Sequence, residues 1–263
     1  MRIQFASDLH LEHIDPYHEP RMPVFAGGEL LLLAGDIDRI RRVFCRFSGW
    51  PCPVFYVRGN HDSYFDGYES GISAAAKLSL TGTVKLLERS EMVLAGVRVL
   101  GCCLWTDFSL MGCVEDAMLL AQYFGPDYRY LRRADGKLIT PEDTKREHHL
   151  TVDWLSRTLA RPFNGSTVVV THHAPHIRSL RRSRGLNRLS SGFASNLLHL
   201  TKQTDVWIHG HVHHTCDYRL GRCRVLCNPA GTTRCPNPFF DPAWVIDIAS
   251  GIKRRGPTET AAR

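Results

Sequence analysis

The sequence predicts an α/β fold, in which strands and helices alternate and pack in layers. Apolar, strand-like runs recur along the 263-residue chain, with helical or irregular segments between the earlier ones. Two of these runs, 30–33 and 168–170, are apolar at consecutive positions, which is typical of strands covered on both faces. The chain is 43% hydrophobic and long enough for one substantial core. We therefore expect one domain over residues 1–252 and a polar, disordered tail at 253–263.

Strands are expected where β-branched and large apolar residues gather between turn-forming residues. In chain order they are 3–7, 30–34, 54–57, 97–100, 167–171, 206–209, 224–227 and 244–248. Residues 111–124 are compatible with a helix. A second helix should run from Pro141 to about residue 160, because Thr140 and Asp143 suit a capped start. Its expected apolar side consists of Leu150, Trp154, Leu155 and Leu159.

The composition favours a cytosolic protein that attracts anions. The formal charge of +7 and the pI near 9.0 suit phosphate esters, nucleotides or nucleic acid, without choosing among them. No stretch approaches the roughly 20 apolar residues of a membrane span, and the chain starts with a strand pattern instead of an apolar leader. We therefore expect a soluble, cytoplasmic protein with no membrane partner.

The nine cysteines are an odd number scattered along the chain, so we expect reduced thiols. A group near the C-terminus lacks the close Cys-x-x-Cys pairing of structural zinc sites, and we expect its members to be buried strand residues. This group is Cys216, Cys223, Cys227 and Cys235.

Five short motifs follow apolar, strand-like runs and should bring their side chains together at one edge of one sheet. They are Asp8-x-His10, Gly35-Asp36, Gly59-Asn60-His61-Asp62, His172 in VTHHAP, and Gly210-His211-x-His213. Carboxylate, amide and imidazole groups form a mixed oxygen and nitrogen set that suits Mn, Fe or Zn. In an extended segment, side chains two positions apart point to the same side, so each pair spaced in this way could reach one ion.

The order and spacing of these motifs resemble those of the calcineurin-like metallophosphoesterases. The resemblance implies a four-layer α-β-β-α sandwich of two mixed sheets flanked by helices, with a dinuclear metal site at strand ends. It also implies which residues hold each ion, with Asp36 as the bridge. The first ion would be held by Asp8, His10, Asp36 and His213, and the second by Asp36, Asn60, His172 and His211.

The same resemblance implies the roles of the residues around the metals. A metal-bridging hydroxide would attack phosphorus, since metal coordination lowers the pKa of water to about 7. His61 would protonate the leaving group or stabilise its charge, while Asp62 would orient the ring of His61 and raise its basicity. Arg58 precedes the third motif, in RGNHD, as in the branch of the family in which an arginine grips the phosphate. The alternative for Arg58 is an exposed side chain near the end of a strand.

Three further regions are candidates for contact with the substrate. His173 follows a predicted ligand and could support that ligand or touch the substrate. The arginine-rich run from Arg178 to Arg188 could be an anion funnel or simply a solvated face. Residues 107–140 could form a wall or cap over the site with their aromatic and arginine residues, which are Tyr123, Tyr128, Arg129, Tyr130, Arg132 and Arg133.

The leading hypothesis is a metal-dependent phosphoesterase that acts on a phosphomonoester or phosphodiester, with a nucleotide or another small phosphate ester as the substrate. A nuclease of the same superfamily is the second enzymatic interpretation, in which nucleic acid is the partner; salt-sensitive DNA binding would favour it. A non-catalytic scaffold with the same fold is the third, but such relatives typically lose metal ligands that this chain retains.

Overall fold

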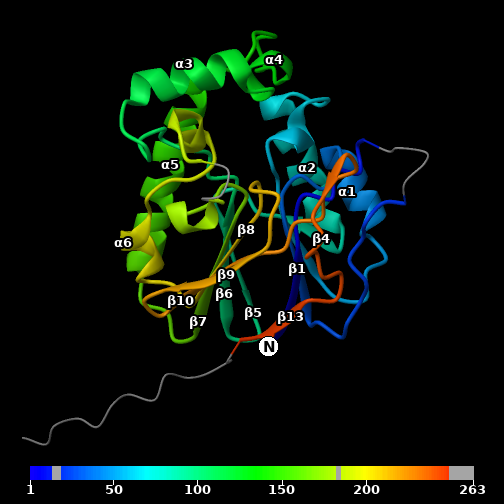
Figure 1. Cartoon of the computed structure of the whole chain (residues 1–263). Helices are drawn as coiled ribbons and strands as arrows, with labels where there is room; N and C mark the ends of the chain where they lie inside the picture. The colour runs from blue at the N-terminus through cyan, green and yellow to red at the C-terminus, as the bar shows by residue number, and fades with distance from the viewer. Residues whose placement is uncertain (14–18, 182–184, 249–263) are drawn as a thin grey trace, which may run out of the picture.

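The computed structural model describes residues 1–13, 19–181 and 185–248. Two large sheets pack face to face, and helices cover the outer face of each sheet (Figure 1). The predicted four-layer α-β-β-α arrangement is confirmed. The predicted tail at 253–263 lies outside the described residues.

The first sheet has five strands in the order β13-β1-β2-β3-β4. Strands β1 to β4 are parallel to their neighbours, and β13 pairs with β1 in the antiparallel direction. The strands are β1 (Arg2–Ala6), β2 (Leu30–Ala34), β3 (Val54–Val57), β4 (Val84–Leu86) and β13 (Val245–Asp247).

The second sheet has six strands in the order β5-β6-β7-β8-β10-β9, with antiparallel pairs at both edges and parallel pairs between them. Its strands are β5 (Ser90–Leu94), β6 (Val97–Cys102), β7 (Ser166–Thr171), β8 (Val206–His209), β9 (Cys216–Leu220) and β10 (Cys223–Cys227). A separate short pair consists of β11 (Gly231–Thr232) and β12 (Cys235–Pro236).

The helices form two outer layers and a bridge across one end of the sheets (Figure 1). They are α1 (Ile40–Arg46), α2 (Tyr68–Thr81), α3 (Val114–Phe124), α4 (Asp127–Tyr130), α5 (Pro141–Ala160) and α6 (Leu198–Thr201), with short 3₁₀ turns η1 (His61–Ser63), η2 (Ile177–Ser179) and η4 (Arg188–Gly192). Helices α1 and α2 cover the first sheet, α5 and α6 cover the second, and α3 and α4 lie over the end where the motifs are. No helix among the described residues is long and apolar enough to cross a membrane.

Alternation along the central strands divides the apolar side chains between two cores. Leu30 and Leu32 point between the sheets, where they belong to the same buried cluster as Val168 and Val170. Leu31 and Leu33 point to the opposite face and pack with residues of α1. The prediction that 30–33 and 168–170 belong to strands covered on both faces is confirmed.

All eight predicted strands form, but three further strands in the large sheets carry no clear signal. These three, β4, β5 and β9, are edge strands. One side of an edge strand faces solvent, so edge strands carry more polar side chains and lack the apolar pattern on which the prediction rests. The sequence of β5, SEMVL, has no fully buried residue.

Helix α5 begins as predicted, with a reciprocal cap. The hydroxyl of Thr140 accepts a hydrogen bond from the amide of Asp143, and the Asp143 carboxylate accepts one from the amide of Thr140. The predicted apolar side is wrong at one position, since Leu150 is exposed while Leu155 and Leu159 are buried. Most of the other buried residues of this helix are polar, including His148, and hydrophobicity alone cannot identify them.

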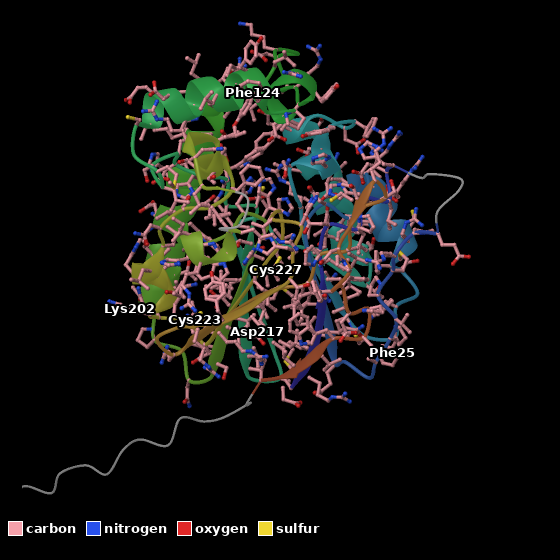
Figure 2. All side chains as sticks on the ribbon, viewed as in Figure 1. Phe25, Phe124, Lys202, Asp217, Cys223 and Cys227 are labelled. Carbon is pink, nitrogen blue, oxygen red and sulfur yellow. The ribbon has the colours of Figure 1, made fainter. Side chains whose placement is uncertain are left out.

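The cysteines are free thiols throughout. Cys223 and Cys227, labelled in Figure 2, are buried on β10, and Cys216 is buried on β9. The expectation of burial is wrong for Cys235, which is exposed on the two-residue strand β12. That strand belongs to the separate two-stranded pair and to neither of the large sheets.

Candidate metal centre

The motif residues meet where strands of both sheets end. Asp8, Asp36 and Asn60 follow β1, β2 and β3 of the first sheet, whereas His172 and His211 follow β7 and β8 of the second. The expectation of one edge of one sheet is therefore wrong. Because the carboxyl ends of the strands in both sheets point the same way, the facing sheets bring their polar ends together.

Five of the motif residues have left-handed backbone conformations, with φ angles from 47° to 67°. They are Asp8, His10, Asp36, His211 and His213. The expected extended geometry of the two spaced pairs is thus wrong, since both pairs lie beyond the ends of β1 and β8. Left-handed residues other than glycine are uncommon and cost free energy, and they gather at functional sites where the surrounding structure holds them.

Glycines in two motifs are needed because side chains of the cluster pack directly on their Cα atoms. A Cβ atom on Gly59 would lie 2.0 Å from Asp36 Oδ1. A Cβ atom on Gly35, which has a φ of +88°, would lie 2.3 Å from His172 Nδ1. No larger residue fits at either place without displacing a predicted ligand.

The first group of predicted ligands is assembled as expected. Ligand atoms of Asp8, His10, Asp36 and His213 all lie within 4.8 Å of one another. His10 Nε2 is 3.1 Å from His213 Nε2 and 3.8 Å from Asp36 Oδ2. His213 Nε2 is 3.3 Å from Asp8 Oδ1. Two imidazole nitrogens and two carboxylates therefore point at one position.

The second group shares Asp36 with the first. Asp36, His172 and His211 form a cluster by the same 4.8 Å criterion. His172 Nε2 lies 3.3 Å from Asp36 Oδ2 and 2.9 Å from Asn60 Oδ1. His172 Nδ1 lies 2.9 Å from the carbonyl oxygen of Ala34, to which it can donate a hydrogen bond. That bond would leave the Nε2 lone pair directed at the cluster.

The electrostatics of this cluster favour cations. Burial opposes ionisation of Asp8 and Asp36, yet the neighbouring histidines hold the pKa of both carboxyls below the ordinary value. Burial likewise opposes charge on His10 and His172, but the surrounding carboxylates raise the pKa of each ring to about 9. A site that draws protons onto buried imidazoles also attracts metal ions. The donor atoms and the electrostatic potential of the cluster therefore both fit a metal centre.

Asp62 does not orient the ring of His61, so that expectation is wrong. The Asp62 carboxylate is fully buried and accepts hydrogen bonds from the amides of Asp36, Ile37, Asp38 and Gly59 and from the hydroxyl of Tyr56. These donors occupy both of its oxygens. Asp62 instead fixes the loop that presents Asp36 to the cluster.

The carboxylate that faces Nδ1 of His61 is that of Glu12, which lies outside the five motifs. Glu12 Oε1 lies 2.9 Å from His10 Nδ1 and 3.8 Å from His61 Nδ1, and the Glu12 side chain is 1% exposed. Among the described residues, neither Glu12 Oε2 nor His61 Nδ1 has a hydrogen-bond partner. The signal in the sequence was a carboxylate two positions after His10, outside the recognised motif.

The structure does not bring the three predicted substrate-binding residues to the cluster's open side. Arg58 is buried, and its Nε donates to Glu88 Oε2 at 2.8 Å. His173 is buried behind His211, with the two ring centroids 4.2 Å apart. Arg178 donates to the carbonyl oxygen of Arg219 and covers the ring of Tyr218.

The arginine run after Arg178 is only partly described, because residues 182–184 lie outside the described residues. Arg181 lines a cavity that reaches the predicted ligand His213 and its neighbour His214, and Arg188 pairs with Asp116. The run is thus distributed over different surroundings, and Arg188 is already paired with a carboxylate.

A cavity of about 290 Å³ opens above Asp36, Asn60 and His61. Segment 107–140 forms one of its walls, as expected, but through Phe108, Phe124, Asp127 and Tyr128 and not through the predicted arginines. Asp127 accepts a hydrogen bond from Asn60 Nδ2 at 2.8 Å and one from the hydroxyl of Tyr64. Burial raises the pKa of the Asp127 carboxyl. No motif or spacing indicates that Asp127 reaches a predicted ligand.

Comparisons with known proteins agree with this geometry. The model of the calcineurin-like phosphoesterase family matches residues 1–215. The phosphopantetheinyl hydrolase from Mycobacterium tuberculosis has a similar fold, with a TM-score of 0.65 and 17% identity over 97% of this chain and 98% of that chain. A candidate 5′-nucleotidase from Staphylococcus aureus aligns with a TM-score of 0.50 and 14% identity over 88% of this chain and 49% of that chain. No curated protein sequence matches.

Proposed function

Because the chain belongs to the calcineurin-like phosphoesterase family and is therefore a metal-dependent phosphoester hydrolase, we propose that it hydrolyses a small phosphate ester at the cluster around Asp36. The observation that carries the proposal is the sharing of the Asp36 carboxylate by two groups of ligand atoms. A carboxylate in this position can serve two cations at once and offset their mutual repulsion.

The predicted ligands would be divided between two ions in the same way as they are divided between the two clusters. Asp8, His10 and His213 would hold one ion together with Asp36. Asn60, His172 and His211 would hold the other with the same carboxylate. Mn, Fe and Zn suit this mixed set of oxygen and nitrogen donors. When bound, the ions would supply Lewis-acid activation of water and of the phosphoryl group.

His61 would donate a proton to the leaving oxygen. Its ring lines the cavity, and its amide donates to Asp36 Oδ1 at 2.9 Å, which ties the residue to the cluster. Glu12 faces Nδ1, so Nε2 is the nitrogen available for the transfer. Burial lowers the pKa of the ring, while the charges of Asp36 and Glu12 oppose that effect. Glu12, in place of Asp62, would keep the ring in position.

The test is hydrolysis of matched chromogenic phosphomonoesters and phosphodiesters by metal-stripped protein reconstituted with Mn, Fe, Zn or Mg. We expect activity only after metal is restored. His61→Ala should lower kcat by about 10²-fold or more while the metal content stays unchanged. His199→Ala, at an exposed position of α6, is the control. Near-normal turnover in His61→Ala at saturating metal would contradict the role of His61.

A further inference from the structure

The cavity above the metal cluster has two walls that are fastened to each other. One wall is the corner between α3 and α4, and the other is η4 with the residue after it. The amide of Met111 donates to Ser191 Oγ at 3.1 Å, and Arg188 of η4 pairs with Asp116 of α3. These contacts connect the two walls of the cavity.

Aromatic and aliphatic side chains dominate these walls. Phe124 ends α3 above the sheets (Figure 2), and Phe193 follows η4 next to the metal cluster, with its ring centroid 4.9 Å from that of His211. Both rings remain accessible, with 56% of Phe124 and 38% of Phe193 exposed. Phe108 and Leu189 extend the apolar lining. Apolar walls beside a few convergent polar groups are the usual composition of a small-molecule site.

The cavity offers no positive charge beyond the metal cluster. None of the described residues that line it is a lysine or an arginine. Its acidic residue outside the cluster is Asp127, which would repel a second anionic group. Binding of nucleic acid or a polyphosphate depends on lysine and arginine contacts to each phosphate, and the described residues that line this cavity supply none. Arg181 lines the adjoining cavity, which shares Phe193 and Val212 with this one.

We propose, on the premise of the proposed function, that the substrate is a phosphate ester whose remaining part is uncharged and apolar, and that Phe124 and Phe193 bind this part. The phosphate would lie at the Asp36 cluster, and the apolar part would extend between the α3–α4 corner and η4. The cavity volume of about 290 Å³ suits a small group, since ligand pockets span roughly 300 to 1,000 Å³.

The experiment uses three phosphonates that cannot be hydrolysed, with affinity for the metal-loaded protein measured by calorimetry. Hexylphosphonate carries an apolar chain, methylphosphonate lacks the chain, and 6-phosphonohexanoate ends the chain in a carboxylate. We expect hexylphosphonate to bind at least about 10-fold more tightly than either of the others, since single apolar groups in a pocket are worth about 10-fold or more.

Substitutions in the walls should remove this preference. Phe124→Ala and Phe193→Ala should each reduce the ratio of hexylphosphonate to methylphosphonate affinity by about 10-fold. Leu119→Ala is the matched control, because Leu119 is 69% exposed on the same helix but does not line the cavity. The corresponding KM values for hexyl phosphate should follow the same order.

The possible results distinguish failure of the apolar subsite from failure of the proposed hydrolysis. Hydrolysis of simple esters with equal affinity for all three phosphonates would overturn the apolar subsite alone. So would a preference that survives both phenylalanine substitutions. Tighter binding of 6-phosphonohexanoate would indicate a cationic subsite and would also overturn it. Absence of hydrolysis and of phosphonate binding with every metal would overturn the proposed function together with the subsite.

Discussion

The cavity has a floor, formed by the cluster around Asp36, and walls, formed by the α3–α4 corner and η4. The two regions differ in polarity and in the kind of element that carries them. The floor consists of charged and polar groups at the ends of strands from both sheets, and several of them have strained, left-handed backbones. The walls consist of apolar side chains on helical segments, and two of their rings are accessible to solvent. Under the two proposals, the charged floor would perform the chemistry and the apolar walls would select the rest of the substrate.

Removing the charge of the shared carboxylate should have the largest effect. Asp36→Asn preserves the size of the side chain, but a neutral amide cannot offset two cations. We expect turnover to fall by about 10³-fold or more, which exceeds the 10- to 100-fold effects of residues behind metal ligands. Steady-state kinetics with saturating metal measure the loss. Asp153→Asn, on the exposed face of α5, should have normal activity.

Glu12→Gln should have an intermediate effect on metal affinity or turnover. The substitution keeps the shape of the side chain but removes the charge that faces His10 and His61. We expect a loss of about 10- to 100-fold in metal affinity or kcat, with KM for simple esters little changed. Metal titrations and kinetics measure the two quantities. Wild-type metal affinity and kcat in Glu12→Gln would show that Glu12 has no positioning role. Glu142→Gln, at an exposed position of α5, is the control.

Asp62→Asn should act on stability, because Asp62 supports the loop of Asp36 and not the ring of His61. An amide group would face backbone N–H donors, leaving at least one of them without an acceptor. We expect the free energy of unfolding to fall by about 3 kcal/mol. Urea unfolding measures it, with the exposed Asp247→Asn as the control. Unchanged stability with strongly reduced turnover would restore the role in orienting His61.

Metal binding should release protons near neutral pH. The carboxylates raise the pKa of His10 and His172 to about 9 in the absence of metal, so both rings are protonated at pH 7 and must lose a proton to bind an ion. Metal affinity should therefore increase as the pH rises, and proton release should fade above about pH 9. Calorimetry in buffers of different ionisation enthalpy measures the release. No release at pH 7 would contradict this picture of the cluster.

The cap of α5 belongs neither to the metal cluster nor to the lining of the cavity. Removing it should therefore have the smallest effect. Thr140→Ala removes the acceptor for the amide of Asp143 and should cost about 1 kcal/mol of stability. Activity should not change. Thr81→Ala, at the exposed C-terminal end of α2, should alter the midpoint of urea unfolding by less than Thr140→Ala does. Equal effects of the two substitutions would show that the cap contributes nothing specific.

The floor could be predicted from the sequence far better than the walls. Central strands and predicted ligands occur in local patterns, because a buried strand is apolar and a close-packed ligand requires a glycine beside it, as at Gly35 and Gly59. The contacts of Glu12 and Asp62 depend on how separate loops meet, which spacing alone does not reveal. The wall residues Phe124 and Phe193 lie far apart in the chain and converge only through tertiary packing.

The most direct test of the account is an anomalous diffraction map of crystals reconstituted with manganese or zinc. We expect two peaks on either side of the Asp36 carboxylate, one among Asp8, His10 and His213 and the other among Asn60, His172 and His211. A single peak would contradict the dinuclear centre. So would an ion bound between His10, Glu12 and His61, the third group of side chains in this chain that could hold one.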